Sequence, residues 1–168
     1  LMPICANNII KQINCDYLIL NNPKANKKFL DQILHKINGH DLLIAIGSGT
    51  INDLCKLASF AKKIKFITFA TAPSMNGYLS ANVSIKISTH KTSLPAHLAR
   101  GVYCDLDILQ KAPQKLIQSG IGDSLCRSTC QFDWYLSNQI LKTKYQQECF
   151  DILKPSEEKL YNNLQKND

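Results

Sequence analysis

The pattern of apolar and polar positions changes period repeatedly along the first two thirds of the chain. Short apolar runs predict strands, and apolar residues spaced three or four positions apart predict helices. The predicted strands are residues 17–20, 42–46, 65–70, 83–87 and 102–104. The predicted helices are residues 25–37 and 51–62, the first with a buried face of Phe29, Leu30, Ile33, Leu34 and Ile37. This alternation predicts an α/β fold, a parallel sheet with helices on both faces.

After about residue 107 the period stays helical. Leu125, Thr129, Phe132, Leu136 and Ile140 follow one another at intervals of three or four residues, without a strand between them. Another helix is expected to begin near residue 155, with acidic residues in its first turn. We therefore predict two domains, an α/β domain of residues 1–107 and the beginning of a helical domain, residues 108–168.

The sequence "IAIGSGTINDLCK", residues 44–56, joins a predicted buried strand to a predicted helix. Small residues let a ligand approach the backbone closely, and free N–H groups at a helix N-terminus suit an anion such as pyrophosphate. The motif is neither G-x-G-x-x-G, because Asn52 replaces the third glycine, nor a P-loop, because Lys56 follows too late. Taken alone it fits a phosphate site or an ordinary strand-to-helix turn.

Two further segments carry candidate chemistry. The loop after residue 70 offers Thr71, Ser74, Asn76 and Ser80 at the carboxyl end of a neighbouring strand, where open α/β sheets bind ligands. A plain polar loop would look the same. Asp123 is predicted to open a helix, where a carboxylate serves either as an N-cap or as a metal ligand.

Composition restricts the function classes. Of the 168 residues, 45% are hydrophobic and 20% charged, which is typical of a soluble globular protein. The sequence shows neither a membrane span nor a signal peptide, so we expect a cytoplasmic protein. The net charge of +7 arises from scattered lysines without a nucleic-acid-binding motif, which favours phosphorylated small molecules over nucleic acid or membrane as partners.

The seven cysteines form no C-x-x-C motif, and their odd number argues against a disulfide framework. Several lie within apolar patterns, so we expect reduced thiols in the core. Cys126 and Cys130 are predicted to share one face of a helix.

Three segments together carry a family resemblance: "GSGTINDLCK", "TAPSMNGYLS" and "GIGDSLCRSTCQFDW". They resemble the glycerol-1-phosphate dehydrogenase branch of the superfamily that contains iron-dependent alcohol dehydrogenases, glycerol dehydrogenase and dehydroquinate synthase. "CDLDILQKAP" resembles the segment between the family's second and third motifs. The similarity spans roughly residues 41–141.

The resemblance implies a Rossmann-like domain that binds NAD or NADP, followed by a helical domain, with a divalent metal (zinc, nickel or iron) and substrate between them. Asp123 matches the metal-binding carboxylate. Asn76 stands at a catalytic position where the family usually has aspartate, and keeps its hydrogen bonds but not its charge. The positions that match cofactor-binding residues are Gly47, Ser48, Gly49, Thr50, Asp53, Thr71, Ser74, Ser80, Asn82 and Lys86.

The implied reaction is hydride transfer between nicotinamide and a polyol phosphate of the glycerol 1-phosphate or dihydroxyacetone phosphate type, with the metal polarising the substrate oxygen. A homo-oligomer is compatible with this function. The family also has two histidine metal ligands after the Gly-Asp motif, whereas no histidine follows Asp123 here. We therefore expect a fragment of a dehydrogenase, and two alternatives stay open: a catalytically silent dinucleotide-binding module and, less favoured, a dehydroquinate synthase-like lyase.

Overall fold

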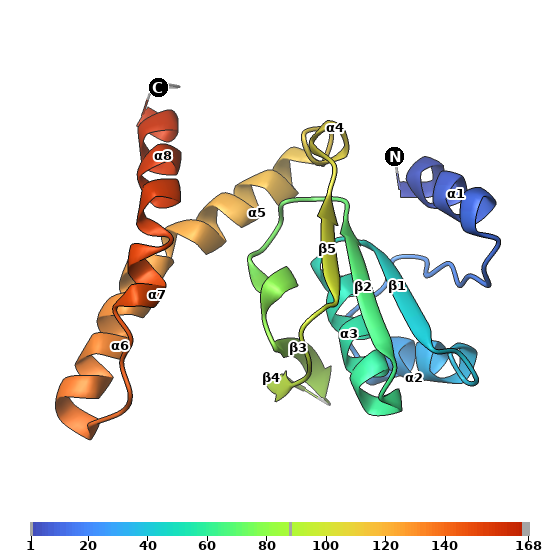
Figure 1. Cartoon of the computed structure of the whole chain (residues 1–168), viewed down its shortest axis with the longest axis horizontal. Coiled ribbons are helices and arrows are strands. Elements are labelled where there is room, and N and C mark those ends of the chain that lie inside the picture. The colour runs from blue at the N-terminus through green and yellow to red at the C-terminus, as the bar shows by residue number, and fades with distance from the viewer. Residues whose placement is uncertain (1, 88, 166–168) are drawn as a thin grey trace. The chain divides into compact units, whose positions relative to one another are not determined.

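The chain divides into two compact units (Figure 1). The computed structural model describes residues 2–87 and 89–165. The first unit ends at Ile121 and the second begins at Gly122. The predicted domain boundary, after residue 107, remains a prediction, because compactness alone does not define a domain.

A three-stranded parallel sheet forms the centre of the first unit. Its strands follow the order β1 (Leu42–Gly47), β2 (Lys65–Ala70) and β5 (Gly101–Cys104). Gly47 lies opposite Ala70 in the ladder, so the carboxyl ends of β1 and β2 meet at one edge. The predicted fold class, a parallel sheet with helices in an α/β arrangement, is confirmed.

Two helices build the core with this sheet. Helix α2 (Lys27–Lys36) begins at Asn26, whose side chain accepts a hydrogen bond from the Phe29 N–H. Its predicted apolar face is confirmed, since Ile33 and Ile37 are buried and the other members pack against the core. Helix α3 (Gly49–Lys62) packs on β1 and β2, and its Leu54 and Ala58 meet Phe66 in the same core.

The predicted strand at residues 83–87 exists, but it does not belong to the parallel sheet. It is β3 (Asn82–Ile87), which pairs antiparallel with the unpredicted strand β4 (His90–Pro95). A parallel crossover usually needs a helix between its strands. Between β2 and β3 the described chain has only the single 3₁₀ turn η1 (Gly77–Leu79), so a separate hairpin forms instead.

The strand predicted at residues 17–20 is wrong. This segment follows helix α1 (Met2–Ile13) and has no strand conformation, and Tyr17 and Ile19 are more than half exposed. An alternating apolar pattern is compatible with a strand, but a strand is stable only when a sheet edge supplies its hydrogen-bond partners.

The helical prediction after residue 107 is confirmed, with one correction. Asp123 does not open a helix: it lies in the last turn of α5, which runs through both Gly120 and Gly122. The pair of glycines suggests a helix break, yet each costs only about 1 kcal/mol relative to alanine. The helices of this part are α4 (Leu106–Leu109), α5 (Gln114–Leu125), α6 (Arg127–Leu141), α7 (Glu148–Asp151) and α8 (Lys154–Gln165).

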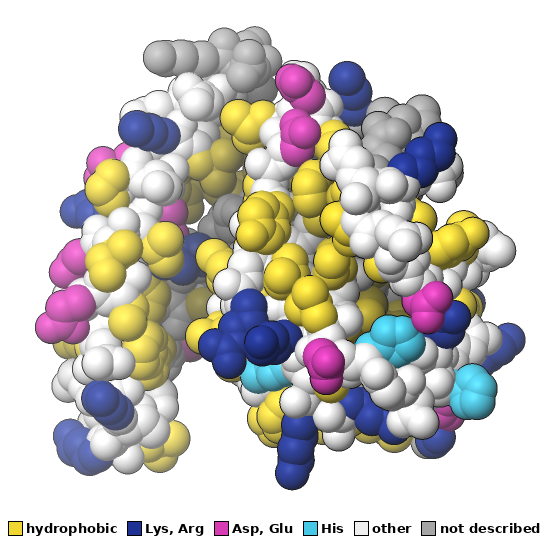
Figure 2. Space-filling view, turned by 45° about the vertical axis from the view of Figure 1, so that its right-hand side comes forward, with side chains coloured by type: hydrophobic (Ala, Val, Ile, Leu, Met, Phe, Trp, Pro, Cys, Tyr) yellow, Lys and Arg dark blue, Asp and Glu magenta, His cyan; other side chains and the backbone are white. Residues whose placement is uncertain are grey.

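Hydrophobic side chains remain exposed in both units (Figure 2). Among the described cysteines all thiols are free, but only Cys55 is buried, which raises its pKa to about 12. The expectation of core thiols is therefore wrong for the other described cysteines: Cys15, Cys104, Cys126, Cys130 and Cys149. Within residues 2–87 and 89–165, no helix is both long and apolar enough to cross a membrane.

Candidate functional site

The turn between β1 and α3 has the geometry of an anion-binding site. Ser48 is the N-cap of α3, in extended conformation, and its side chain makes no capping hydrogen bond. The Asn26 and Asp105 side chains, by contrast, cap the first turns of α2 and α4. Ser48 therefore leaves the first N–H groups of α3 uncapped, and such groups suit an anion, which the helix dipole also favours.

The two glycines of this turn stand where an added side chain would meet close neighbours. A Cβ atom at Gly47 would lie 2.7 Å from the Cβ of Ile51, so the strand can reach the helix only without a side chain there. A Cβ atom at Gly49 would lie 2.9 Å from Sδ of Met75. Gly47 is buried and Gly49 half-buried, and a turn of such small residues fits a dinucleotide, whose pyrophosphate must approach the backbone closely.

The loop after β2 lies beside this turn. The Thr71 N–H donates a hydrogen bond of 3.1 Å to the carbonyl of Gly47, so the candidate residues of both segments start from neighbouring strand ends. Thr71 is buried, whereas Ser74 is half-buried and Asn76 exposed. The Tyr78 hydroxyl donates to the Ala72 carbonyl at 2.8 Å, and burial raises the pKa of this tyrosine, with a hydrogen bond to Ser74 acting in the opposite direction.

Asp53 connects α3 with the β-hairpin. One carboxylate oxygen accepts a hydrogen bond of 3.1 Å from the Ser84 N–H, and the other accepts from the side chain of the fully buried Asn52 at 3.0 Å. Its hydrogen bonds thus go to β3 and to its neighbour. Asn52, at the position of the third glycine of a dinucleotide fingerprint, orients this carboxylate.

Ser80, Asn82 and Lys86 follow the turn η1 in the order of the chain. The Ser80 hydroxyl donates to the Asn82 carbonyl and accepts from the Asn82 N–H, both at 3.0 Å, which fixes the entry into β3. Lys86 lies four residues further, about 13 Å along an extended strand. Its N–H donates to the Ala25 carbonyl, so the backbone of Lys86 is joined to the start of α2, not to the turn at residues 47–50.

Helix α5 approaches the loop through a glycine. A Cβ atom at Gly120 would lie 1.7 Å from the carbonyl oxygen of Pro73, so helix backbone and loop backbone are in direct contact. Asp123 follows one turn later in the same helix and is half-buried. Its carbonyl accepts a hydrogen bond from the Cys126 thiol.

A divalent metal does not fit the described residues as a complete site. Residues 2–87 and 89–165 contain no group of three or more histidine, cysteine, aspartate or glutamate residues that could hold a metal ion. Catalytic zinc, for example, usually has three protein ligands. Asp123 alone therefore stays the predicted metal ligand.

The sequence pattern does not reveal two polar contacts of α3. Lys56 is fully buried, and its ammonium donates hydrogen bonds to the carbonyls of Gly77 and Ser80. One turn later, Ser59 contacts Nε2 of His97 at 2.8 Å. Lysine in an amphipathic helix is ordinarily exposed, but the helical spacing of Asn52, Lys56 and Ser59 among apolar neighbours is a signal of a buried polar stripe.

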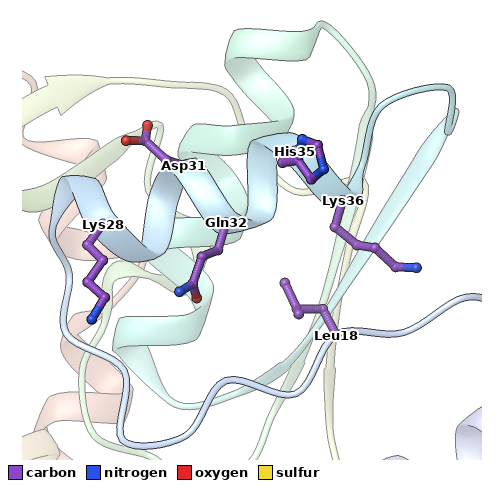
Figure 3. A pocket seen from close by; sticks show the side chains of 6 residues that line it. All are labelled: Leu18, Lys28, Asp31, Gln32, His35 and Lys36. Atoms are coloured by element: carbon purple, nitrogen blue, oxygen red, sulfur yellow. The ribbon is translucent and has the colours of Figure 1, made fainter.

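An open hollow of about 640 Å³ lies between α2 and the segment around Leu18 (Figure 3). Asp31 points away from Lys28 and Gln32, so the polar groups do not converge on a common point. Convergent polar groups distinguish a binding site from a surface depression. We therefore place the candidate site at the β1–α3 turn and the loop after β2.

Comparison with known families shows which family the chain resembles. The model of a family described as iron-containing alcohol dehydrogenase matches residues 6–113. Two relatives are named glycerol-1-phosphate dehydrogenase (NAD(P)+): that of Bacillus subtilis is 34% identical over 119 residues, 71% of this chain and 30% of the relative. That of Pyrococcus horikoshii is 38% identical over 124 residues, 73% of this chain and 36% of the relative.

Solved structures give the same fold. Glycerol dehydrogenase from Schizosaccharomyces pombe superposes with a TM-score of 0.65 at 22% identity, covering 74% of this chain and 34% of that enzyme. An iron-containing alcohol dehydrogenase from Corynebacterium glutamicum has a TM-score of 0.64 at 16% identity, covering 79% of this chain and 38% of that structure. The chain thus spans about a third of the length of the proteins that it matches.

Proposed function

Because this chain belongs to the iron-containing alcohol dehydrogenase family, we propose that it forms the dinucleotide-binding part of an NAD(P)-dependent dehydrogenase. The proposed substrate is a polyol phosphate of the glycerol 1-phosphate or dihydroxyacetone phosphate type, in keeping with the names of the relatives. The observation that carries this proposal is the α3 N-terminus without a side-chain cap, at the carboxyl end of β1 and beside the loop after β2. Open α/β sheets bind dinucleotides at such a place.

In this proposal the pyrophosphate binds to the backbone of the first turn of α3, through Gly47, Ser48, Gly49 and Thr50. Thr71 and Ser74 line the dinucleotide from the neighbouring loop. A bound nicotinamide would supply hydride transfer, and the protein's contribution is to hold and orient it.

Asp53 acts in this proposal through the backbone. Its hydrogen bonds to Asn52 and to the N–H of Ser84 hold β3 against α3. Ser80 and Asn82 shape the end of the loop after β2, and Lys86 adds positive charge that favours a phosphorylated ligand. Asn76 provides a side-chain amide where the family usually has a carboxylate, so it can donate and accept hydrogen bonds but cannot act as a base.

A second candidate function is a dinucleotide-binding module without catalysis. It is favoured by the observation that the described residues contain no cluster able to hold a metal. The two candidates differ in one measurement, the NADPH-dependent reduction of dihydroxyacetone phosphate by the chain. Both require the same dinucleotide site, in which Asp123 has no direct part.

The first prediction tests that site. Gly49→Val should weaken NADPH binding by more than tenfold, about 1.4 kcal/mol, because the new side chain fills the space over the turn and displaces Met75. The fold should persist, because the displaced atoms are the end of a flexible side chain. Isothermal titration of both proteins measures the affinity, and circular dichroism checks the fold.

Lys62→Ala is the matched control for this experiment. It changes an exposed residue at the other end of the same helix and should leave the affinity unchanged. Equal NADPH affinity of Gly49→Val and the unaltered chain would refute the proposed site. A folded unaltered chain without affinity for NADPH or NADH would refute dinucleotide binding by this chain.

A further inference from the structure

Lys56 is buried without exposed surface in the second turn of α3. Its Nζ atom lies 2.8 Å from the carbonyl oxygen of Gly77 and 2.7 Å from that of Ser80. Lysine is almost never fully buried unless its charge is compensated. The position therefore has a specific role, which apolar packing of the helix does not explain.

The surroundings of Lys56 favour a charged donor. Burial lowers the pKa of this lysine, and the Asp53 carboxylate acts in the opposite direction. The two carbonyl oxygens accept hydrogen bonds, and their partial negative charge also favours the ammonium form. An ammonium group is thus held between the helix and the loop as a bridge with two hydrogen bonds.

These two carbonyls enclose the turn η1. The Ser80 N–H also donates to the Gly77 carbonyl at 3.2 Å, so Gly77 accepts from the loop and from the helix. The same loop carries Ser74, which we propose as a dinucleotide-lining residue. A fixed conformation at residues 77–80 therefore determines where the preceding polar groups lie.

The helix that carries Lys56 also carries the proposed phosphate turn. Lys56 follows Gly49 by about two helical turns, and Met75 of the loop contacts Gly49. The loop is thus attached to α3 at two levels, by packing at the helix N-terminus and by the ammonium group further along. Because one rigid helix makes both attachments, the turn and the loop keep a constant relative position.

We propose that Lys56 is a positioning residue that fixes the loop of residues 73–80 relative to the phosphate turn. The dinucleotide-binding groups of the two segments then form one preorganised surface. The effect on the ligand rests on the proposed function, whereas the effect on the loop does not. Removing the ammonium would take one of two donors from the Gly77 carbonyl and the Lys56 donor from the Ser80 carbonyl, and would release the loop.

The experiment compares K56M, K56R and the control K62M. Methionine resembles lysine in length but donates no hydrogen bond, and arginine restores charge and donors in a different geometry. Amide hydrogen exchange followed by mass spectrometry measures the loop and the strands β1 and β2 separately, and isothermal titration measures NADPH binding. In K56M the loop should exchange at least tenfold faster, with unchanged β1 and β2, and NADPH should bind at least tenfold more weakly.

In K56R both effects should be smaller than in K56M, and K62M should match the unaltered chain. Faster exchange that is equal in the loop, β1 and β2 would overturn the proposal, because Lys56 would then stabilise the whole unit. Unchanged loop exchange in K56M would also overturn it. If the unaltered chain binds no NADPH, the proposed function fails, but the exchange data still decide whether Lys56 fixes the loop. If K56M does not fold, the loop and strand exchange of K56R decides.

Discussion

The two units of the chain differ in how they bury side chains. In the first unit Leu54, Ala58 and Phe66 form a core of residues with at most 1% exposure. In the described part of the second unit no side chain is buried, and Phe132 and Ile152 are 61% and 77% exposed. The hydrophobic effect scales with the apolar area removed from water. The first unit therefore has a fully buried core, which the described residues of the second unit do not form.

Polar contacts show a similar difference. In the first unit the buried Lys56 side chain of α3 donates hydrogen bonds to two carbonyls of the loop after β2. The buried Asn52 side chain donates a hydrogen bond to the Asp53 carboxylate. In the second unit the half-buried side chains of Arg127 and Glu157 form an ion pair between α6 and α8, and the Trp134 N–H donates to the Lys144 carbonyl. The proposed binding surface thus belongs to the unit that has its own buried core.

The first pair of substitutions compares the two glycines of α5. Gly120→Ala places a methyl group 1.7 Å from the Pro73 carbonyl oxygen in the first unit, so the backbone of the helix or of the loop must shift. The free energy of unfolding should fall by about 3 kcal/mol, the upper range for overpacking. Urea denaturation followed by circular dichroism measures this change.

Gly122→Ala is the matched control, two residues later in the same helix. A Cβ atom at Gly122 meets nothing within 4 Å, so alanine should stabilise the helix by about 0.5–1 kcal/mol. Equal stability of both variants would mean that α5 does not approach the loop as the structure shows.

The second pair of substitutions compares a buried with an exposed leucine. Leu54→Ala removes a core side chain of 1% exposure and should lower the free energy of unfolding by about 2–5 kcal/mol. Leu141→Ala changes a residue of 71% exposure and should alter it by less than about 0.5 kcal/mol. Urea denaturation of both variants under identical conditions gives the two values. A loss for Leu141→Ala as large as that for Leu54→Ala would show that this leucine is covered in solution.

The sequence predicts those parts of the fold in which periodicity and burial agree. The strand at residues 65–70 is found with the same bounds, and the apolar face of the helix around Ile33 is buried as predicted. Both predictions depend on the local spacing of apolar residues, and in both elements one side faces the core. The proximity of the two candidate loops was likewise predictable, because neighbouring parallel strands end at one edge.

The predictions fail where residues far away in the sequence determine the local structure. Residues 17–20 have a strand-like pattern but no ladder, whereas the polar strand β4 forms because β3 lies opposite it. The burial of Lys56 depends on carbonyls more than twenty residues later. The reason for a glycine at position 120 is its contact with Pro73, which lies far away in the sequence. Local spacing can indicate a buried polar stripe, but it does not identify the distant groups that the stripe contacts.

The smallest expected effect concerns His97, and its measurement reports on one of the two units. All four histidines precede Gly122, so histidine titration reports on the first unit alone. Burial lowers the pKa of His97, and the positive charges of Arg100 and Lys56 lower it further. The Ser59 hydroxyl donates its proton to the Lys56 carbonyl at 2.9 Å, so its oxygen accepts the hydrogen bond from His97. Neutral His97 therefore carries its proton on Nε2.

A lowered pKa means that the unfolded chain binds the His97 proton more tightly than the folded chain. The free energy of unfolding should therefore fall as the pH drops from about 6.5, the ordinary histidine pKa, towards the lower pKa of the folded state. In His97→Gln this acid-induced fall in the free energy of unfolding should be absent. The control variant His35→Gln, which changes an exposed residue of α2, should show the same fall as the unaltered chain. Urea denaturation at pH 7.5 and 5.5 gives the comparison. An identical pH dependence of His97→Gln and the unaltered chain would mean that His97 does not titrate differently on folding.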